Sequence, residues 1–386
     1  MVLVLDGVVR HYDWGSTSSL PSLLGRPEDG RPWAELWFGA HPSAPSLAGP
    51  DRTPLDQVIG GDPVGALGAA VHDQFGGLPF LLKVLAAGHP LSLQAHPSSA
   101  QAKAGFARED AAGIPVDAPH RSFRDRIHKP ELICALTPFD ALCGFREPDA
   151  TLEVLATIDT PALDDLRSRL RSIDGDGLHA LLRELLTLES SSAVALVGAV
   201  VEACQDPGPD EHADVRSMVV ALGERYPGDA GILTATLLNL VHLLPGEALF
   251  LGAGNLHAYL SGTGVEIMAN SDNVLRGGLT SKHIDVPTLL DTVDARPLVV
   301  DVQRPESVGG VAVYDTPVPE FSLKRLELAG PADVSGPAIL LCTDGVIEVA
   351  GCALDRGAAA WISAADGPVG VDGQGTLFVA AVGDEH

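Results

Sequence analysis

Residues 78–97 read LPFLLKVLAAGHPLSLQAHP, and this stretch decides the expected fold. It contains two short apolar runs, separated by a Gly-His-Pro turn and closed by Pro97. Apolar runs of this length between turn-forming residues are typical of β-strands joined by loops. Residues i and i+2 of a strand point to the same face, so Gln94 and His96 are expected to project side by side. The stretch therefore predicts a β-rich fold that presents two metal-binding side chains on one face.

The pattern of the chain changes in its middle third. Within residues 147–240, leucines recur at helical spacing, as at Leu163, Leu166 and Leu170. Such spacing places them on one face of a helix. This segment is therefore predicted to be a block of helices inserted into a β-rich protein.

Short apolar runs return after the helical block and continue to the end of the chain. Among them, Asp344-Gly345 lies between two apolar runs and predicts a β-hairpin. Strands on both sides of a helical block indicate a β-barrel or sandwich with an insertion, followed by a second β-unit. The expected domains are a β domain that carries the metal site (1–146 plus 241–295), a helical insertion (147–240) and a C-terminal β domain (296–386).

The composition limits what the protein can bind. The chain has 386 residues, enough for two or three domains. Its net charge of −26 argues against nucleic acid and anionic membranes as partners, because both require a basic surface. The N-terminus lacks a basic leader before an apolar stretch, and no apolar run approaches the roughly 20 residues of a spanning helix. We therefore expect a cytoplasmic protein.

Three short motifs contribute candidate metal ligands. They are QAHP, HKPE and NLHAY, and they supply Gln94, His96, Glu131 and His257. Taken singly, each motif is more often an ordinary polar pair, a surface ion pair or a hydrogen-bonding histidine. Together they form a nitrogen and oxygen ligand set without sulfur, which suits Zn²⁺ or a similar divalent ion kept open for chemistry.

A fourth segment, GVEIMANSDNVLRGGLTSKH, spans residues 264–283. It carries Glu266, Arg276 and Lys282 on a glycine-rich background. The two glycines after Arg276 allow backbone and ligand to approach closely. A solvated loop with a salt bridge is the alternative for this segment considered alone.

In these motifs the chain resembles the type I phosphomannose isomerases, a zinc-dependent family of cupins. The resemblance covers most of residues 8–290 in order, apart from the helical block, and the remainder is similar in layout only. It is carried by HYDWGS (11–16), AELWFGAHPSAPS (34–46), PFLLKVL (79–85), PLSLQAHPS (90–98), HKPELICAL (128–136), GEALFLGAGNLHAYLSGTGVEIM (246–268) and SDNVLRGGLTSKH (271–283).

The resemblance implies a fold and an activity. The fold would be a cupin jelly-roll β-barrel with an α-helical block and a second, cupin-like C-terminal unit. The activity would be a zinc-dependent aldose-ketose isomerisation between mannose 6-phosphate and fructose 6-phosphate, within GDP-mannose biosynthesis. One Zn²⁺ per subunit, a small sugar phosphate as the partner, and a monomer are expected, with an oligomer left open.

The resemblance also implies roles for single residues. The zinc ligands would be Gln94, His96, Glu131 and His257, and the catalytic arginine would be Arg276. The substrate pocket would be lined by Ser92, Lys129, Glu266 and Lys282, with Trp14 and Tyr259 as its walls.

The expected reaction moves a proton between C2 and C1 of the sugar through a cis-enediol, whose negative charge must be stabilised. Arg276 would stabilise that charge, and Ser92 with Lys129 or Lys282 would hold the phosphate. The general base stays open among Glu266, a histidine and metal-bound water. Two alternatives also stay open: a metal cupin oxygenase, which would favour iron and more histidines, and a non-catalytic sugar-phosphate-binding cupin.

Overall fold

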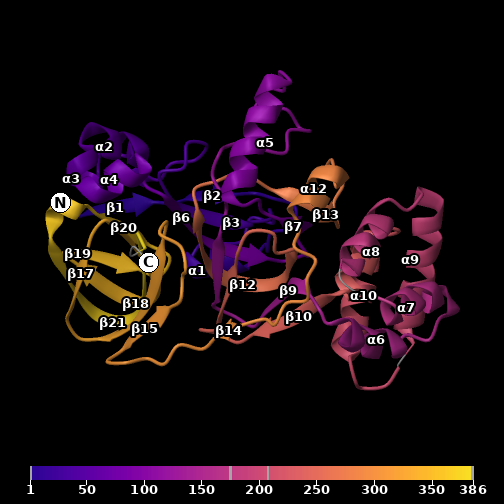
Figure 1. Cartoon of the computed structure of the whole chain (residues 1–386). Coiled ribbons are helices and arrows are strands. Elements are labelled where there is room, and N and C mark those ends of the chain that lie inside the picture. Colours follow the sequence, from indigo (N-terminus) through magenta and orange to yellow (C-terminus); the bar gives the residue numbers. More distant parts are fainter. Residues whose placement is uncertain (1, 174–175, 207, 384–386) are drawn as a thin grey trace.

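The computed structural model describes residues 2–173, 176–206 and 208–383, which form two antiparallel β-sheets accompanied by helices (Figure 1). The eleven strands of the first sheet are β2 (Val8–Arg10), β3 (Glu35–Gly39), β6 (Phe80–Ala87), β7 (Leu93–Ala95), β8 (Glu131–Ala135), β9 (Phe139–Phe145), β10 (Leu238–Leu243), β11 (Ala248–Leu251), β12 (His257–Ala269), β13 (Leu275–Gly278) and β14 (Val302–Gln303). The ten strands of the second are β1 (Leu3–Asp6), β4 (Leu47–Ala48), β5 (Thr53–Pro54), β15 (Val311–Tyr314), β16 (Ser322–Ala329), β17 (Ala332–Ser335), β18 (Ala338–Val349), β19 (Cys352–Asp355), β20 (Ala359–Ile362) and β21 (Pro368–Ala381). The β-rich fold predicted from the sequence is thus confirmed.

Strand β12 is the centre of the first sheet because it changes partners along its length. Its first residues pair with β7 and β9, and its later residues pair with β6 and β8. The register shifts between Tyr259 and Ser261, and Gly262 follows with a φ of +113°. A side chain at Gly262 would lie 2.6 Å from the carbonyl oxygen of Pro138, so glycine is required there. This strand contributes both a metal-ligand candidate and a substrate-pocket candidate.

The hairpin predicted at Asp344-Gly345 is wrong, because β18 runs straight through both residues. The register between β18 and β21 shifts between Cys342 and Asp344, and Gly345 has a φ of +77°. A side chain at Gly345 would collide with the carbonyl oxygen of Gln374 on β21. The glycine therefore marks a bulge where two long strands approach closely, and not a turn.

The N-terminus belongs to the second sheet. β1 pairs with β20, with Leu3 opposite Trp361, so the first strand of the chain completes a sheet formed mainly by its last part. The predicted domain boundaries assign residues 1–146 to one unit and therefore do not anticipate that the first strand joins the C-terminal sheet. The division into three domains otherwise stays a prediction.

Helices α6–α11 lie between β9 and β10 and form the helical block on the right of Figure 1. β9 and β10 pair with each other, so the chain leaves the sheet and returns to the neighbouring strand. Arg146 closes this junction by donating to the carbonyl oxygens of Thr236 and Leu238, at 3.0 and 2.6 Å. The helices are α6 (Pro148–Ala156), α7 (Asp164–Arg171), α8 (Gly177–Leu186), α9 (Ser190–Gln205), α10 (Ala213–Arg225) and α11 (Gly231–Thr236), with a 3-10 turn at Pro161–Leu163.

A histidine on β10 attaches the helical block to the sheet a second time. His242 Nδ1 lies 2.6 Å from Asp140 Oδ1 on β9, and His242 Nε2 lies 3.1 Å from Asp214 Oδ2 on α10. Inside the block, buried leucines such as Leu166 and Leu182 pack in one apolar cluster with Leu93 of β7. The block therefore shares its core with the sheet that carries the metal-ligand candidates.

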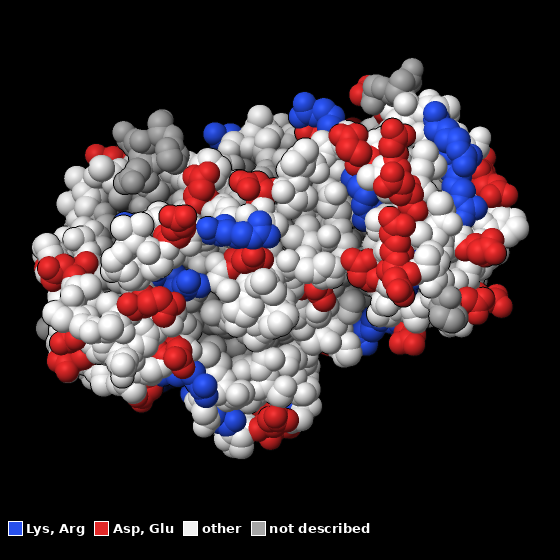
Figure 2. Space-filling view, turned by 90° about the horizontal axis from the view of Figure 1, so that it is seen from below, with Lys and Arg blue, Asp and Glu red and all other residues white. Residues whose placement is uncertain are grey.

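The other helices surround the sheets: α1 (Ser19–Leu23), α2 (Leu55–Gly61), α3 (Pro63–Leu67), α4 (Ala69–Phe75), α5 (Ser99–Ala111), α12 (Val286–Thr292) and a second 3-10 turn at Ala364–Asp366. Of the helices in the described ranges, none is by itself long and apolar enough to cross a membrane, and only α8 with α9, bent by 107°, passes that test as a pair. Figure 2 shows acidic side chains gathered in a band on the side of the molecule where the helical block lies.

Candidate metal centre and substrate cavity

Three buried side chains converge at one end of the first sheet. They are His96, directly after β7, Glu131, the first residue of β8, and His257, the first residue of β12. The Nε2 atoms of His96 and His257 each lie 3.4 Å from Glu131 Oε2. All three residues are at most 1% exposed.

The three facing atoms are unpartnered in the part of the chain that the structure describes. His96 Nε2, His257 Nε2 and Glu131 Oε2 are buried without a hydrogen bond. Buried polar atoms are normally satisfied, so three of them that face one another indicate a binding site for a cation. These residues therefore fit a divalent metal ion.

The backbone orients both histidine rings for this role. His96 Nδ1 donates to the carbonyl oxygen of Asn273 at 2.7 Å, and His257 Nδ1 donates to that of Asn255 at 2.9 Å. A carbonyl oxygen only accepts, so each Nδ1 carries the proton and each Nε2 presents its lone pair. Burial, and then the charge of Lys129, lower the pKa of His96 to about 4. At neutral pH this histidine is thus the neutral form that binds metals.

Glu131 is held ionised by its neighbours. Burial alone would favour the protonated carboxyl, but Lys129 and His96 hold the pKa of Glu131 well below its usual range. Lys129 Nζ donates to Glu131 Oε1, which leaves Oε2 directed at the histidines. One carboxylate oxygen is therefore fixed by a cation and the other is available to the metal.

Gln94, the fourth predicted ligand, lies beside this cluster. In the strand register it is opposite His257 of β12 and opposite Arg276 of β13. It lines the same cavity as Glu131. Its position two residues before His96 is the spacing that places two side chains on one face of an extended strand. Metal binding by Gln94 stays a prediction.

A cavity of about 510 Å³ opens next to the metal-ligand candidates. Its lining includes every predicted site residue except the fully buried His96 and His257, although the individual roles stay predictions. These lining residues are Trp14, Ser92, Gln94, Lys129, Glu131, Tyr259, Glu266, Arg276 and Lys282.

A buried ionic network in the wall of the cavity is not predicted by the sequence reasoning. Lys83 on β6 lies 2.9 Å from Glu266 on β12 and 3.5 Å from Glu35 on β3, and Glu35 accepts a hydrogen bond of 2.7 Å from Trp37. Burial opposes the charge on Lys83, but Glu266 and Glu35 raise its pKa above the usual range. The one available signal was that Lys83, one of only five lysines in the chain, lies inside the decisive apolar run.

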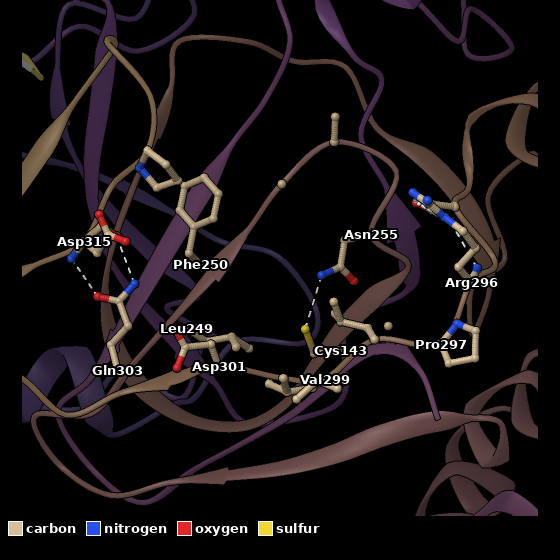
Figure 3. A pocket seen from close by; sticks show the side chains of 17 residues that line it. Cys143, Leu249, Phe250, Asn255, Arg296, Pro297, Val299, Asp301, Gln303 and Asp315 are labelled. Carbon is tan, nitrogen blue, oxygen red and sulfur yellow. Dashed lines mark hydrogen bonds and ion pairs between the residues drawn. The ribbon is translucent and has the colours of Figure 1, made fainter. Parts of the chain in front are cut away.

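A second cavity, of about 550 Å³, has Asn255 among its lining residues (Figure 3). Asn255 Nδ2 donates to Cys143 Sγ at 3.2 Å, and Gln303 is paired with the backbone of Asp315 nearby. None of the three metal-ligand candidates lines this cavity. The backbone carbonyl of Asn255 nevertheless orients His257, so the two cavities share one loop.

Comparison with known proteins gives a consistent result over nearly the whole chain. The family model described as phosphomannose isomerase type I, catalytic domain, matches residues 2–148. Mannose-6-phosphate isomerase from Escherichia coli (strain K12) is 39% identical over 96% of this chain and 96% of its own length. The Bos taurus protein of the same name is 34% identical over 90% of this chain and 88% of its own.

Solved structures agree with these relatives. A lysine-to-alanine mutant of phosphomannose isomerase from Salmonella typhimurium superposes with a TM-score of 0.91 at 36% identity, covering 99% of this chain and 100% of that chain. A zinc-bound crystal structure of mannose 6-phosphate isomerase gives a TM-score of 0.90 at 36% identity with the same coverage.

Proposed function

The chain belongs to the type I phosphomannose isomerase family, and from this premise we propose that it interconverts mannose 6-phosphate and fructose 6-phosphate with one bound zinc ion. The observation that carries the proposal is the set of three unpartnered ligand atoms, on His96, Glu131 and His257, beside a polar cavity. A family of isomerases that includes zinc-bound members supports the same conclusion.

The metal would be held by His96, Glu131 and His257, with Gln94 as the fourth ligand. Two neutral imidazoles, one carboxylate and one amide oxygen form a donor set that suits zinc in an open, catalytic site. A bound zinc ion supplies Lewis acidity, which polarises the oxygens of the sugar.

The chain's own residues would bind the substrate and stabilise charge. Arg276 keeps its proton at any working pH and lies next to Gln94 in the register, where it would stabilise the negative charge of a cis-enediol. Ser92 and Lys282 would hold the phosphate, while Trp14 and Tyr259 enclose the sugar.

The remaining parts of the proposal concern the fold, the oligomeric state, the cellular location and the pathway. We place the metal site in a cupin jelly-roll, with the sheet around β18 and β21 as a second, cupin-like unit. A monomer in the cytoplasm, serving GDP-mannose biosynthesis, is part of the same proposal. An oxygenase or a non-catalytic cupin would share the cavity, but family membership favours the isomerase.

A coupled assay tests the function. Fructose 6-phosphate formed from mannose 6-phosphate is followed before chelation, after chelation and after zinc is returned. The proposal predicts activity that disappears with the chelator and returns with zinc. Oxygen consumption with iron-loaded protein would instead identify an oxygenase, and sugar-phosphate binding without turnover in folded, zinc-loaded protein would identify a binding module.

A further inference from the structure

Three of the cationic side chains that line the cavity form neither a hydrogen bond nor an ion pair in the described part of the chain. Arg124, Arg276 and Lys282 all line the cavity, and no side-chain nitrogen of theirs has a hydrogen-bond acceptor or an ion pair within residues 2–173, 176–206 and 208–383. After the larger effect of burial, the charge of Arg124 contributes to lowering the pKa of both Arg276 and Lys282. Like charges that are held together without a counter-ion repel one another, so this cluster indicates a bound anion.

The acidic groups whose charges reach the cluster are engaged elsewhere. Asp272 Oδ1 lies 3.5 Å from His41 Nε2, and Asp13 Oδ2 lies 3.5 Å from an Arg225 guanidinium nitrogen. Neither carboxylate forms an ion pair with the three cations. Since the whole chain carries a net charge of −26, a locally cationic surface is what an anionic ligand requires here.

The backbone of Arg124 is fixed relative to the metal-ligand candidates. Its N–H donates at 2.7 Å to Asn273 Oδ1, and Asn273 is fully buried. Asn273 Nδ2 donates in turn to the carbonyl oxygens of Asp125 and Ile127, at 3.0 and 2.9 Å. The carbonyl oxygen of Asn273 accepts from His96 Nδ1. One buried asparagine thus sets the distance between the loop that carries Arg124 and the metal end.

We propose that Arg124 binds the phosphate group of the substrate together with Lys282, beside Arg276. This inference rests on the proposed function and adds a residue to which the predicted site gave no role. A guanidinium donates two parallel hydrogen bonds to phosphate oxygens and stays protonated, which gives both charge and orientation. Because Arg276 also adjoins Gln94, phosphate held at this cluster leaves the sugar directed toward the metal ligands.

Arg126 provides a matched control for the experiment. It lies two residues further along the same exposed segment and stacks over the Phe106 ring at 4.9 Å, and it does not line the cavity. Wild type, Arg124→Gln, Arg124→Lys and Arg126→Gln are compared for kcat, for KM of mannose 6-phosphate and for the inhibition constant of inorganic phosphate. Circular dichroism verifies that each variant is folded.

Arg124→Gln is expected to raise both KM and the phosphate inhibition constant by about tenfold, with kcat within about twofold, because a charge-assisted phosphate contact is lost. Arg124→Lys should recover part of the loss, and Arg126→Gln should match wild type. Equal KM and inhibition constants in Arg124→Gln and Arg126→Gln would overturn the inference, as would a loss confined to kcat.

The inference and the proposed function can fail separately. If the zinc-loaded wild type does not isomerise mannose 6-phosphate, the proposed function fails, and calorimetric titration with inorganic phosphate decides the role of Arg124. Affinity that drops in Arg124→Gln and not in Arg126→Gln supports phosphate binding. Affinity that is the same in both variants refutes it.

Discussion

Two of the sites at which histidine lies close to carboxylate in this molecule have opposite consequences. At the metal centre, His96 and His257 donate through Nδ1 to backbone carbonyls and leave Nε2 unpartnered beside Glu131. On the surface, His242 places each ring nitrogen within hydrogen-bonding distance of a carboxylate, one from the sheet and one from the helical block. The first hydrogen-bond arrangement presents nitrogen lone pairs to a metal. The second favours an imidazolium that bridges two anions.

Burial explains the difference. Burial lowers the pKa of His96 to about 4, whereas the Asp140 carboxylate raises the pKa of the half-exposed His242. Where water is excluded, a charged histidine is costly and the neutral ligand form wins. Where water remains, the charged histidine forms an ion pair that contributes little to the stability of the fold. The same residue types therefore form a metal-binding site in one place and a weak surface ion pair in the other.

The largest effect should separate the two histidine sites by metal content. His257→Ala removes a ligand and is expected to lose most bound zinc and at least about a hundredfold in activity, since an open zinc site depends on each protein ligand. His242→Ala, the matched control, should keep one zinc per chain and full activity. Elemental analysis after gel filtration measures both variants, and full occupancy in His257→Ala would refute the assignment.

The next effect concerns a buried charge in the wall of the cavity. Lys83→Met leaves Glu266 and Glu35 without their common cation, and breaking a buried ion pair costs roughly 3–5 kcal/mol of unfolding free energy. Lys103→Met, on the exposed face of α5, should change stability by less than about 0.5 kcal/mol. Urea denaturation compares them, and similar midpoints would show that the Lys83 network does not stabilise the fold.

Substitutions of Arg276 test whether this unpaired cation takes part in the reaction. Arg276→Ala should retain zinc and lose about 100-fold in kcat, the effect of removing one group that stabilises developing charge. The kcat of Arg276→Lys should lie between those of wild type and Arg276→Ala, because lysine keeps the positive charge but lacks the planar guanidinium. Near-normal turnover of the alanine variant in steady-state assays would remove Arg276 from the mechanism.

The smallest expected effect is the pH dependence of the stability that the surface histidine contributes. The pKa of His242 is raised in the folded state, first by Asp140 and, against burial, by Asp214. Its stabilising contribution is therefore complete below the unfolded pKa of 6.5 and is lost as pH rises through the folded value. Since the side chain is half exposed, the loss should stay below about 1 kcal/mol.

Denaturation midpoints at pH 6 and pH 8.5 measure this contribution. Wild type should lose slightly more stability over that interval than His242→Gln. A wild type that gains stability relative to the variant as pH rises would reverse the assigned sign.

The combination of sequence motifs predicts the metal centre more fully than the rest of the site. Strand alternation predicts that Gln94 and His96 share a face, and the three motifs together predict one metal-ligand set, of which the structure brings together His96, Glu131 and His257. Glu35 and Arg124 could not be found this way. Glu35 comes close to Lys83 through the pairing of β3 with β6, and the backbone of Arg124 is held by one hydrogen bond to Asn273, far along the chain.

The same limit explains the errors in the predicted fold. Asp344-Gly345 has the composition of a hairpin turn, but the pairing of β18 with β21 along both of its halves converts the glycine into a bulge. β1 enters the second sheet through a partner, β20, that lies more than 350 residues later in the sequence. Long-range pairing overrides local propensity in both cases.

The most direct test of the metal centre is anomalous diffraction from crystals of the active, zinc-loaded protein, recorded on both sides of the zinc absorption edge. We predict one peak per chain, at about 2.0–2.2 Å from Nε2 of His96, Nε2 of His257 and Oε2 of Glu131, with Gln94 as the fourth protein ligand. A zinc peak elsewhere, or no peak between these three side chains in active crystals, would contradict the account.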